Sequence, residues 1–198
     1  MDFIKNMLVS VIALGFFMAV PADAGEHWLI NNDQSVLHYV SVKKMHTGEL
    51  HTIDGVSGTV SDDGTVTAEL DMASVNSGID VRDGRMKEML YKIAEFPTAT
   101  FDGSVDLEEF SDLAIGESVD SFVDGVLNLV GTNAELSFGV IVTRKSEDSV
   151  LVTSAGPIII DAATVNLTNG IESLREIAQL ESISYSVPVQ LTIALDRN

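Results

Sequence analysis

Hydrophobic and polar residues alternate with a period of two along much of the chain. The alternation is clearest in the segments TVTAELDM (65–72), AELSFGVIV (134–142) and ISYSVPVQLTIAL (183–195). Because successive side chains of a β-strand point to opposite faces, each segment predicts a strand with one apolar and one polar face. The apolar faces comprise Val66, Ala68, Leu70, Met72, Ala134, Leu136, Phe138, Val140, Val142, Ile183, Tyr185, Val187, Val189, Leu191, Ile193 and Leu195.

Weaker strand patterns fill much of the remaining sequence. They cover residues 28–32, 36–42, 57–60, 98–105, 121–130 and 150–160. Short turns such as Asp62-Asp63-Gly64 and Gly131-Thr132-Asn133 separate several of them, with glycine providing a positive φ. Strands joined by short turns pair antiparallel, and eight or nine strands at this spacing predict a sandwich or a closed barrel.

One segment near 82–94 follows a helical period instead. Its apolar residues recur at i, i+3, i+4 and i+7, and they are Met86, Met89, Leu90 and Ile93. We expect Pro97 to end this helix, because residues before a proline avoid the α region.

A second helix is predicted near 170–180. Its apolar stripe consists of Ile171, Leu174, Ile177 and Ala178. Asn169 is the expected N-cap, and Glu172, three residues later, would complete a capping box. Each helix has to cover an apolar surface, and the open mouth or an exposed seam of a barrel would provide one.

The N-terminus has the pattern of a secretory signal peptide. An apolar run at 7–20, too short for a comfortable membrane span, precedes the small-residue segment Ala22-Asp23-Ala24. We predict a signal peptide over 1–24, a single mature domain over 25–198 and a periplasmic or secreted location. No later run of about 18 apolar residues occurs, so no membrane span is expected in the mature chain.

Composition and charge exclude several classes of function. The 198 residues include no cysteine, which excludes disulfides, thiolate metal sites and a cysteine nucleophile. The formal net charge of -19 repels nucleic-acid phosphates and anionic lipid surfaces, so we expect no nucleic-acid partner.

Candidate catalytic and metal-binding residues are few. His38, His46 and His51 lie near one predicted hairpin and would bind a metal if they converged, although ordinary surface or loop positions are the favoured interpretation. No nucleophile elbow, dinucleotide loop or phosphate loop occurs, so an enzyme dependent on His46 or His51 ranks last among the hypotheses. Arg82 and Asp83 would either grip a polar ligand head or fix the start of the helix, and we favour the structural role.

A central segment, SVNSGIDVRDGRMKEMLYKIAEFPTATF (74–101), has a more specific pattern. A Ser-Val pair, a glycine, an Arg-Asp pair and a short helix precede Phe-Pro and a new strand. The residues concerned are Ser74, Val75, Gly78, Arg82, Asp83, Phe96, Pro97, Thr100 and Phe101. In this order they closely resemble the YceI-like lipid/polyisoprenoid-binding family. The likeness spans nearly the whole mature chain, but the segment 157–180 carries a helix where the family has an arginine-led Phe-Gly segment.

The resemblance implies an extended, lipocalin-like antiparallel barrel that holds an isoprenoid chain and has no catalytic residues. An eight-stranded barrel has an interior that can hold one small ligand. We therefore expect a mainly β fold, an eight-stranded barrel with short helices near 82–94 and 170–180, and no cofactor other than a bound isoprenoid lipid or quinone-like molecule. The helix at 82–94 would be a lid whose methionines close an apolar tunnel. The predicted ligand-binding residues are Leu70, Met72, Met86, Met89, Ile93, Phe96, Phe101, Phe138, Val140, Tyr185 and Val187.

The sequence leaves a second class of function open. In this alternative the chain is a stress-related barrel with a packed core that acts through a protein partner or as a homodimer. The apolar segment Pro157–Ile160 is the one candidate for an exposed contact surface.

Overall fold

The computed structural model describes residues 27–110 and 112–198. The predicted signal peptide, 1–24, lies outside these residues and stays a prediction. The strands are β1 (His27–Ile30), β2 (Val36–Lys43), β3 (Thr47–Ile53), β4 (Val56–Ser61), β5 (Thr65–Asp71), β6 (Val75–Asn76), β7 (Thr98–Ser104), β8 (Ser118–Leu129), β9 (Thr132–Arg144), β10 (Ser149–Ser154), β11 (Ile158–Asp161) and β12 (Ser186–Arg197). The helical elements are α1 (Asp80–Arg85), α2 (Thr168–Ile177), the π-helical turn η3 (Met86–Leu90) and the 3₁₀ turns η1 (Asn32–Gln34), η2 (Met72–Ser74) and η4 (Leu107–Phe110).

Eight strands form a closed antiparallel ring, so the predicted barrel is confirmed. The order is β1-β4-β5-β7-β8-β9-β10-β12, and β12 pairs back onto β1. Trp28 opposite Arg197 and Ile30 opposite Leu195 set the register of this closure. Closure removes the free strand edges that would otherwise promote aggregation.

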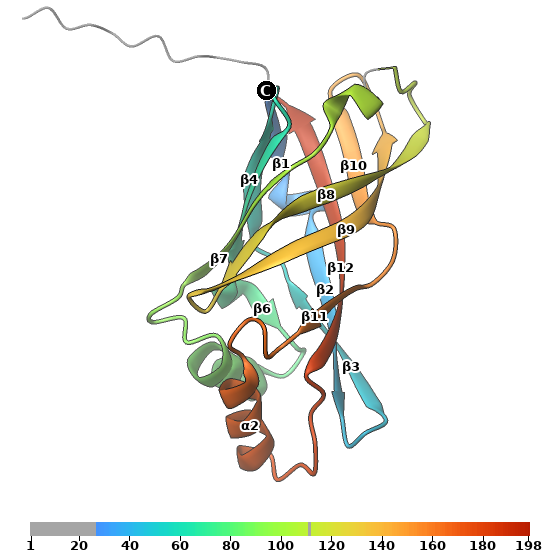
Figure 1. The fold of residues 1–198 in the computed structure, drawn as a ribbon. Coiled ribbons are helices and arrows are strands. Elements are labelled where there is room, and N and C mark those ends of the chain that lie inside the picture. The colour runs from blue at the N-terminus through green and yellow to red at the C-terminus, as the bar shows by residue number, and fades with distance from the viewer. Residues whose placement is uncertain (1–26, 111) are drawn as a thin grey trace, which may run out of the picture.

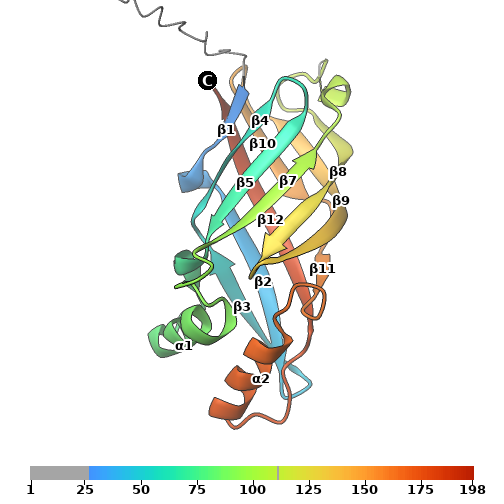
Figure 2. The same cartoon turned by 60° about the vertical axis from the view of Figure 1, so that its left-hand side comes forward.

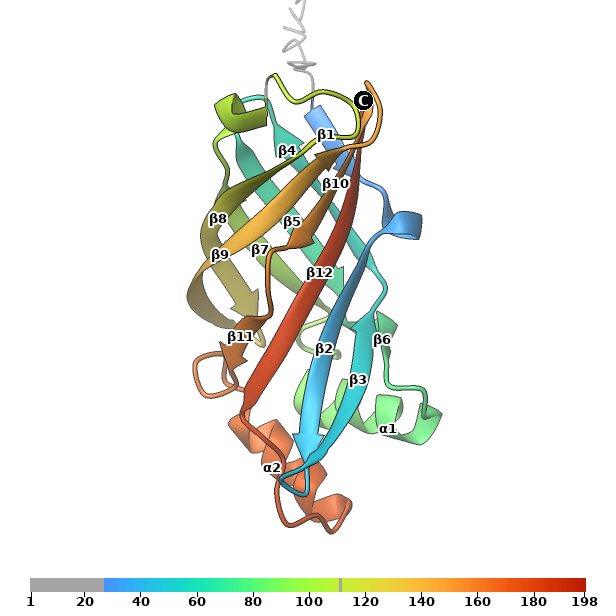
Figure 3. The ribbon, with the colours of Figure 1, turned by 90° about the vertical axis from the view of Figure 1, so that its right-hand side faces the viewer.

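The long strand β12 extends the barrel beyond the ring at one end. Its C-terminal half pairs with β1 and β10, whereas its N-terminal half pairs with β2 and β11. The β2–β3 hairpin and β6 continue this wall. Figures 1 and 3 show the hairpin and both helices at this end, which we call the helical end, and the C-terminus at the opposite end.

The two helical segments differ in detail from their predictions. The first begins at Asp80, turns π-helical at Met86 and ends at Leu90, well before Pro97. Lys92, with a φ of 50°, reverses the chain there, so the expectation that Pro97 ends the helix is wrong. Because the helix stops early, Ile93 does not belong to its apolar stripe. None of the helices within 27–110 and 112–198 combines the length and the apolar character needed to span a bilayer.

The predicted capping box of α2 is also wrong. Leu167 occupies the N-cap position without a side-chain hydrogen bond to the backbone, and Asn169 lies within the first turn. Glu172 instead accepts hydrogen bonds from Arg175 at 2.6 Å and from the hydroxyl of Tyr185 at 2.7 Å. The Glu172 carboxylate is therefore occupied by these two side chains and does not reach back to the start of the helix.

Three strand predictions change as well. The segment 150–160 is broken by Ala155-Gly156-Pro157 into β10 and β11, because proline cannot donate to a strand ladder. The strand predicted from Ile183 begins only at Ser186. Strand β3 is absent from the predicted set, because Glu49 and His51 point to the interior and interrupt the apolar alternation.

Candidate functional site

The barrel encloses an apolar cavity of about 510 Å³ that continues beneath the helices. Strands β2, β3, β5, β7, β8, β9 and β12 all contribute inward-facing side chains. The apolar wall includes Leu37, Ile53, Ala68, Leu127, Leu136, Val189, Leu191 and Ile193. Its volume falls in the range of about 300–1,000 Å³ that is usual for ligand pockets. The alternation read from β5, β9 and β12 therefore produces a wall around an open space.

Two helical segments lie at the helical end of the barrel (Figure 2), and both contribute side chains to the cavity lining. Met86 and Leu90 contribute from the π-helical turn, and α2 contributes the stripe Ile171, Leu174, Ile177 and Ala178. Gly170 lets the two segments touch, since a Cβ there would lie 2.8 Å from the Leu90 Cα atom. The helices thus pack on each other as well as over the cavity.

Aromatic rings form part of the cavity wall, which continues past them to Ile30, Val66 and Leu195. The rings of Phe101 and Phe138 lie 5.8 Å apart. Gly103 and Gly125 are cross-strand partners, and a Cβ at either would approach the Phe101 ring within 2.7 Å. The two glycines therefore make room for this ring. A small core built on Val123, Val140 and Val142 packs against both rings, and Val123 and Val140 of this core line the cavity as well.

Charged side chains surround the cavity at the helical end. Glu49 forms ion pairs with Lys43 at 2.7 Å and with Arg82 at 2.6 Å, and all three side chains are about a quarter exposed. Burial alone would raise the pKa of Glu49, but the hydrogen bonds and charges of Lys43 and Arg82 outweigh it and hold that pKa below its usual value. These part-exposed groups line the cavity where it meets solvent.

Arg82 and Asp83 are tied to the chain before α1. Asp83 accepts hydrogen bonds from the backbone N–H and the hydroxyl of Ser77. Arg82 donates to the Ser77 hydroxyl and to the Ser77 carbonyl, each at 2.8 Å. These contacts support the structural role favoured from the sequence, and Arg82 lines the cavity in addition.

A neutral polar group lies deeper in the cavity wall. The rings of Tyr39 and His51, which are cross-strand neighbours, stack at 4.9 Å, and Tyr91 donates a hydrogen bond to the Tyr39 hydroxyl at 3.0 Å. Burial raises the pKa of Tyr39 far above its usual value and that of Tyr91 to about 12. Burial and, secondarily, the positive charge of Arg82 lower the pKa of His51. All three side chains are therefore neutral at neutral pH.

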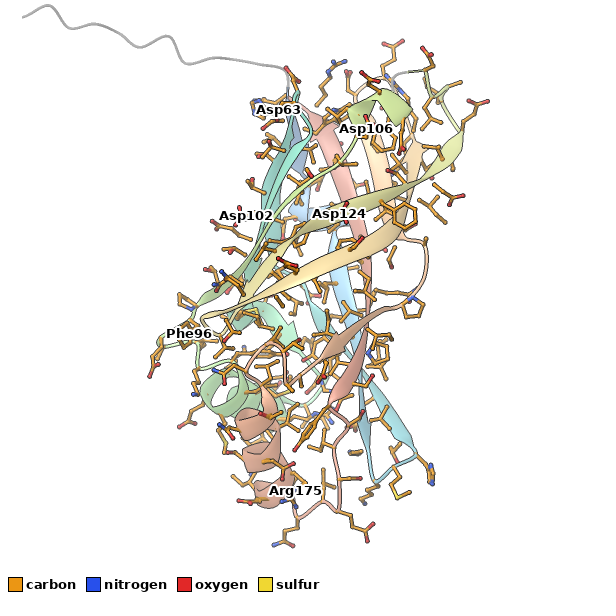
Figure 4. The ribbon with its side chains drawn as sticks, in the orientation of Figure 1. Asp63, Phe96, Asp102, Asp106, Asp124 and Arg175 are labelled. Carbon is orange, nitrogen blue, oxygen red and sulfur yellow. The ribbon has the colours of Figure 1, made fainter. Side chains whose placement is uncertain are left out.

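Seven of the predicted ligand-binding residues line this cavity, and four do not. Those that line it are Leu70, Met72, Met86, Phe101, Phe138, Val140 and Val187. Met89 and Ile93 lie outside the lining set, and Phe96 packs against Gly131 at the β8–β9 turn, where Figure 4 labels it. Tyr185 is 40% exposed and bonds to Glu172. Direct contact between these seven lining residues and a bound ligand stays a prediction.

The three candidate histidines do not converge. His51 faces the cavity, His38 belongs to the opposite face of the same hairpin sheet, and His46 is exposed in the β2–β3 turn. Within the described part of the chain, no group of three or more His, Cys, Asp or Glu side chains is placed to hold a metal ion.

The sequence analysis missed Tyr39, Glu49 and Tyr91 as cavity residues. Tyr39 belongs to a predicted strand, and its inward position follows from the alternation Leu37, Tyr39, Ser41. Tyr91 follows the buried Leu90 at the end of the helical segment, and no periodicity marks it. Glu49 is a charged residue on the inner face of the barrel. In sequence such a residue looks like one of the outer face, so alternation alone cannot place it inside.

Cationic side chains are concentrated at the helical end. Of the ten Lys and Arg residues within 27–198, seven belong to the β2–β3 hairpin, α1, η3, α2 or the loop after η3, and they are Lys43, Lys44, Arg82, Arg85, Lys87, Lys92 and Arg175. Acidic residues extend along the whole barrel, and Figure 4 shows Asp63 and Asp106 at the end opposite Arg175, with Asp102 and Asp124 between.

Comparison with known proteins identifies the family. The model of the YceI-like domain matches residues 28–195. The solved structure of a polyisoprenoid binding domain from Saccharophagus degradans, implicated in plant cell wall breakdown, is 36% identical and superposes with a TM-score of 0.83, covering 86% of this chain and 98% of that domain. No protein of curated function matches the chain.

More distant structures share the fold. BcnA from Burkholderia cenocepacia is 16% identical with a TM-score of 0.65, over 83% of this chain and 98% of its own. A mutant CJ YceI protein with a monobromobimane guest is 12% identical with a TM-score of 0.57, over 75% of this chain and 84% of its own. With its matching domain and closed barrel, the chain belongs to the YceI-like domain family.

Proposed function

We propose that this protein is a periplasmic or secreted, non-catalytic binding protein that sequesters or carries an isoprenoid lipid or quinone-like molecule in its barrel. The observation that carries the proposal is the cavity of about 510 Å³, whose wall is aliphatic and aromatic over most of its length. The polyisoprenoid binding domain at 36% identity supports the choice of ligand class.

The physical basis of binding is burial of the guest's hydrocarbon chain. Transfer from water into an apolar cavity stabilises the complex by about 0.8 kcal/mol for each CH₂-sized group. A branched chain that fills the space between the helices and the Phe101–Phe138 pair would bind with no charged contact. The loss of translational and rotational freedom offsets part of this gain.

Native mass spectrometry of protein purified from its own host, followed by organic extraction, tests the proposal. We expect an added mass that is released into the solvent and identified as an isoprenoid compound. Protein that is empty when purified, and that takes up no isoprenoid alcohol or quinone when these are offered, would contradict it.

A substitution that fills the cavity tests whether the guest lies inside. Ala68 faces the cavity from β5, and Ala68→Phe should lower the bound isoprenoid at least tenfold by occupying its space. Thr67→Phe, at the neighbouring exposed position on the outer face, is the matched control and should bind normally. Equal retention of lipid by both variants would place the guest elsewhere.

The proposed location has its own test. Cell fractionation and the intact mass of the processed protein should give a periplasmic or secreted chain that begins at Gly25. A cytoplasmic chain that retains residues 1–24 would refute this part of the proposal.

A second candidate function is supported by exposed apolar side chains. Ile159 of β11 is 58% exposed, and in the β2–β3 hairpin Leu50 is 61% and Met45 is 70% exposed. In this alternative the barrel acts through a protein partner or a homodimer. Light scattering and lipid extraction together distinguish the two candidate functions. A monomer that carries lipid favours the carrier, and a dimer without lipid favours the alternative.

A further inference from the structure

His51 is a buried polar side chain whose hydrogen-bonding capacity is unused. The residue is 3% exposed and lines the cavity, yet neither of its ring nitrogens has a hydrogen-bond partner among the described residues. Leaving a buried donor or acceptor unpaired costs about 1–3 kcal/mol. A buried group of this kind calls for a partner inside the cavity.

Tyr39 offers a second hydrogen-bonding group at the same place. Its ring stacks on His51, and its hydroxyl oxygen accepts the hydrogen of Tyr91. A phenol carries one hydrogen of its own, so Tyr39 can donate that hydrogen to a further acceptor. A neutral imidazole adds one N–H donor and one nitrogen acceptor. Together the two side chains present two donors and one acceptor.

The position of Tyr39 and His51 along the barrel sets the orientation of a bound guest. The inward-facing pairs of the β2–β3 hairpin change in order from apolar to neutral polar to charged, and they are Leu37 with Ile53, Tyr39 with His51, and Ser41 with Glu49. A guest whose polar head lies at the middle pair has its tail against Leu37 and Ile53 and, beyond them, the wall that leads to Phe101. Its head then points to the helical end.

The charge of the surroundings favours a neutral head. Glu49 is already paired with both Lys43 and Arg82, and Asp83 is held by Ser77. The two phenols and the imidazole have no charge to balance an anion. Arg85 is the remaining cation of the lining, at the rim of the cavity.

We propose that Tyr39 and His51 form a subsite for the neutral, oxygen-bearing head of an apolar guest, a hydroxyl or a carbonyl group. The inference rests on the proposed function and adds the chemistry of the head and the direction of the tail. A hydroxyl can satisfy both kinds of group, because it accepts from Tyr39 or the imidazole N–H and donates to the other imidazole nitrogen. A carbonyl accepts only.

Four probes that share one isoprenoid chain test the subsite. Farnesol, its methyl ether, farnesyl monophosphate and the hydrocarbon farnesene would be compared by competition against a fluorescent lipid probe. We expect farnesol to bind about tenfold more tightly than farnesene, the ether to lie between them, and the phosphate to gain nothing over farnesol. Tighter binding of the phosphate would assign the head to the cations of the rim and overturn the proposal.

Variants separate this subsite from lipid binding in general. In His51→Phe and in Tyr39→Phe, the ratio of farnesol affinity to farnesene affinity should fall to about twofold or less. His38→Phe, on the other face of the same hairpin, should keep the full advantage. If farnesene binds but farnesol gains nothing in the wild type, the subsite is refuted and the proposed function stands. If no probe binds, the proposed function itself fails.

A measurement on the wild-type chain covers the case in which a variant does not fold. The ring ¹⁵N and ¹H NMR signals of His51 should shift when farnesol binds and shift much less with farnesene. Equal responses to both probes would overturn the proposal without any substitution.

Discussion

His51 links the interior of the barrel to pH. Burial and the charge of Arg82 lower the pKa of His51 in the folded protein. In the unfolded chain a histidine has a pKa of about 6.5. Between these two values the unfolded state binds more protons than the folded state, so stability falls as the pH drops below about 6.5. Glu49, Asp83 and Lys43 also face the imidazole, and the two carboxylates oppose the shift.

The pH effect can be measured by urea unfolding of the wild type and His51→Phe. The free energy of unfolding of the wild type should decrease more steeply than that of the variant as the pH falls from about 7 to about 5. Both proteins keep His27, His38 and His46, so these residues cancel in the difference. Parallel pH profiles would show that His51 titrates normally in the folded state.

The pKa of Glu49 gives a separate, more acidic effect. Because its folded pKa lies below the usual value, its contribution to stability is present above the unfolded pKa, about 4.3, and is lost as the pH falls through the folded pKa. Glu49→Gln should therefore reduce the loss of stability below about pH 4.5. It should also enlarge the effect of His51 below about pH 6.5, because the Glu49 carboxylate opposes the lowering of the His51 pKa. Circular dichroism during acid titration would resolve the two steps.

At the scale of elements, the contact between α2 and the π-helical turn depends on one glycine. A Cβ at Gly170 would lie 2.8 Å from the Leu90 Cα atom and 2.9 Å from the Met89 carbonyl oxygen, and backbone cannot yield as a flexible side chain does. Gly170→Val should lower the free energy of unfolding by about 1–3 kcal/mol and weaken lipid retention by lifting α2. The exposed neighbour provides the control, Asn169→Val, which should change stability by about 0.5 kcal/mol or less.

Thermal melts and lipid release rates would check this prediction. If Gly170→Val releases a bound guest no faster than Asn169→Val, then α2 does not hold the guest in the cavity.

Hydrophobic periodicity predicted which face of an element is buried, but not what the buried face covers. Met86 and Met89 belong to one predicted stripe, yet only Met86 reaches the cavity, because the turn becomes π-helical and the chain reverses at Lys92. Phe96, a predicted ligand-binding residue outside the cavity lining, packs on the Val130–Gly131 turn, which has a positive φ at both residues. Such contacts between distant segments leave no local pattern.

At the scale of the molecule, antiparallel pairing of neighbours in sequence followed from the short turns. Strand alternation and turn length do not distinguish a sandwich from a closed barrel, and only the family resemblance favours the barrel. Ring closure joins the first strand to the last, as in the pair Ile30 and Leu195, and no local pattern records that pairing. Six of the seven predicted residues that line the cavity come from predicted strands, where alternation is a reliable guide to an apolar inner face, and Met86 comes from the helical stripe. The polar inner residues Glu49 and His51 broke that alternation and hid both β3 and the polar part of the site.

The depth of the cavity makes a prediction about guest length. Phe101 fills the space over Gly103 and Gly125, and Phe101→Ala would widen the cavity beside the second core, whose Val123 and Val140 already line it. We expect a loss of stability of about 3 kcal/mol or less, since Phe101 is only partly buried, and a shift in preference toward isoprenoid alcohols longer by one unit. Thr100→Ala, which adds no space to the cavity, is the control for competition assays with chains of increasing length.

The uneven distribution of charge makes the protein an electric dipole along the barrel axis. The seven cations of the helical end are matched by seven carboxylates of the same elements, whereas the opposite end carries Asp63, Asp106 and other carboxylates in excess. In the field of an anionic surface, such a molecule experiences a torque that turns its less negative helical end toward the surface, and at 0.1 M salt this alignment is largely screened beyond about 10 Å. The entrance of the cavity would thus face such a surface before any specific contact has formed, while the net charge of -19 still repels the molecule as a whole.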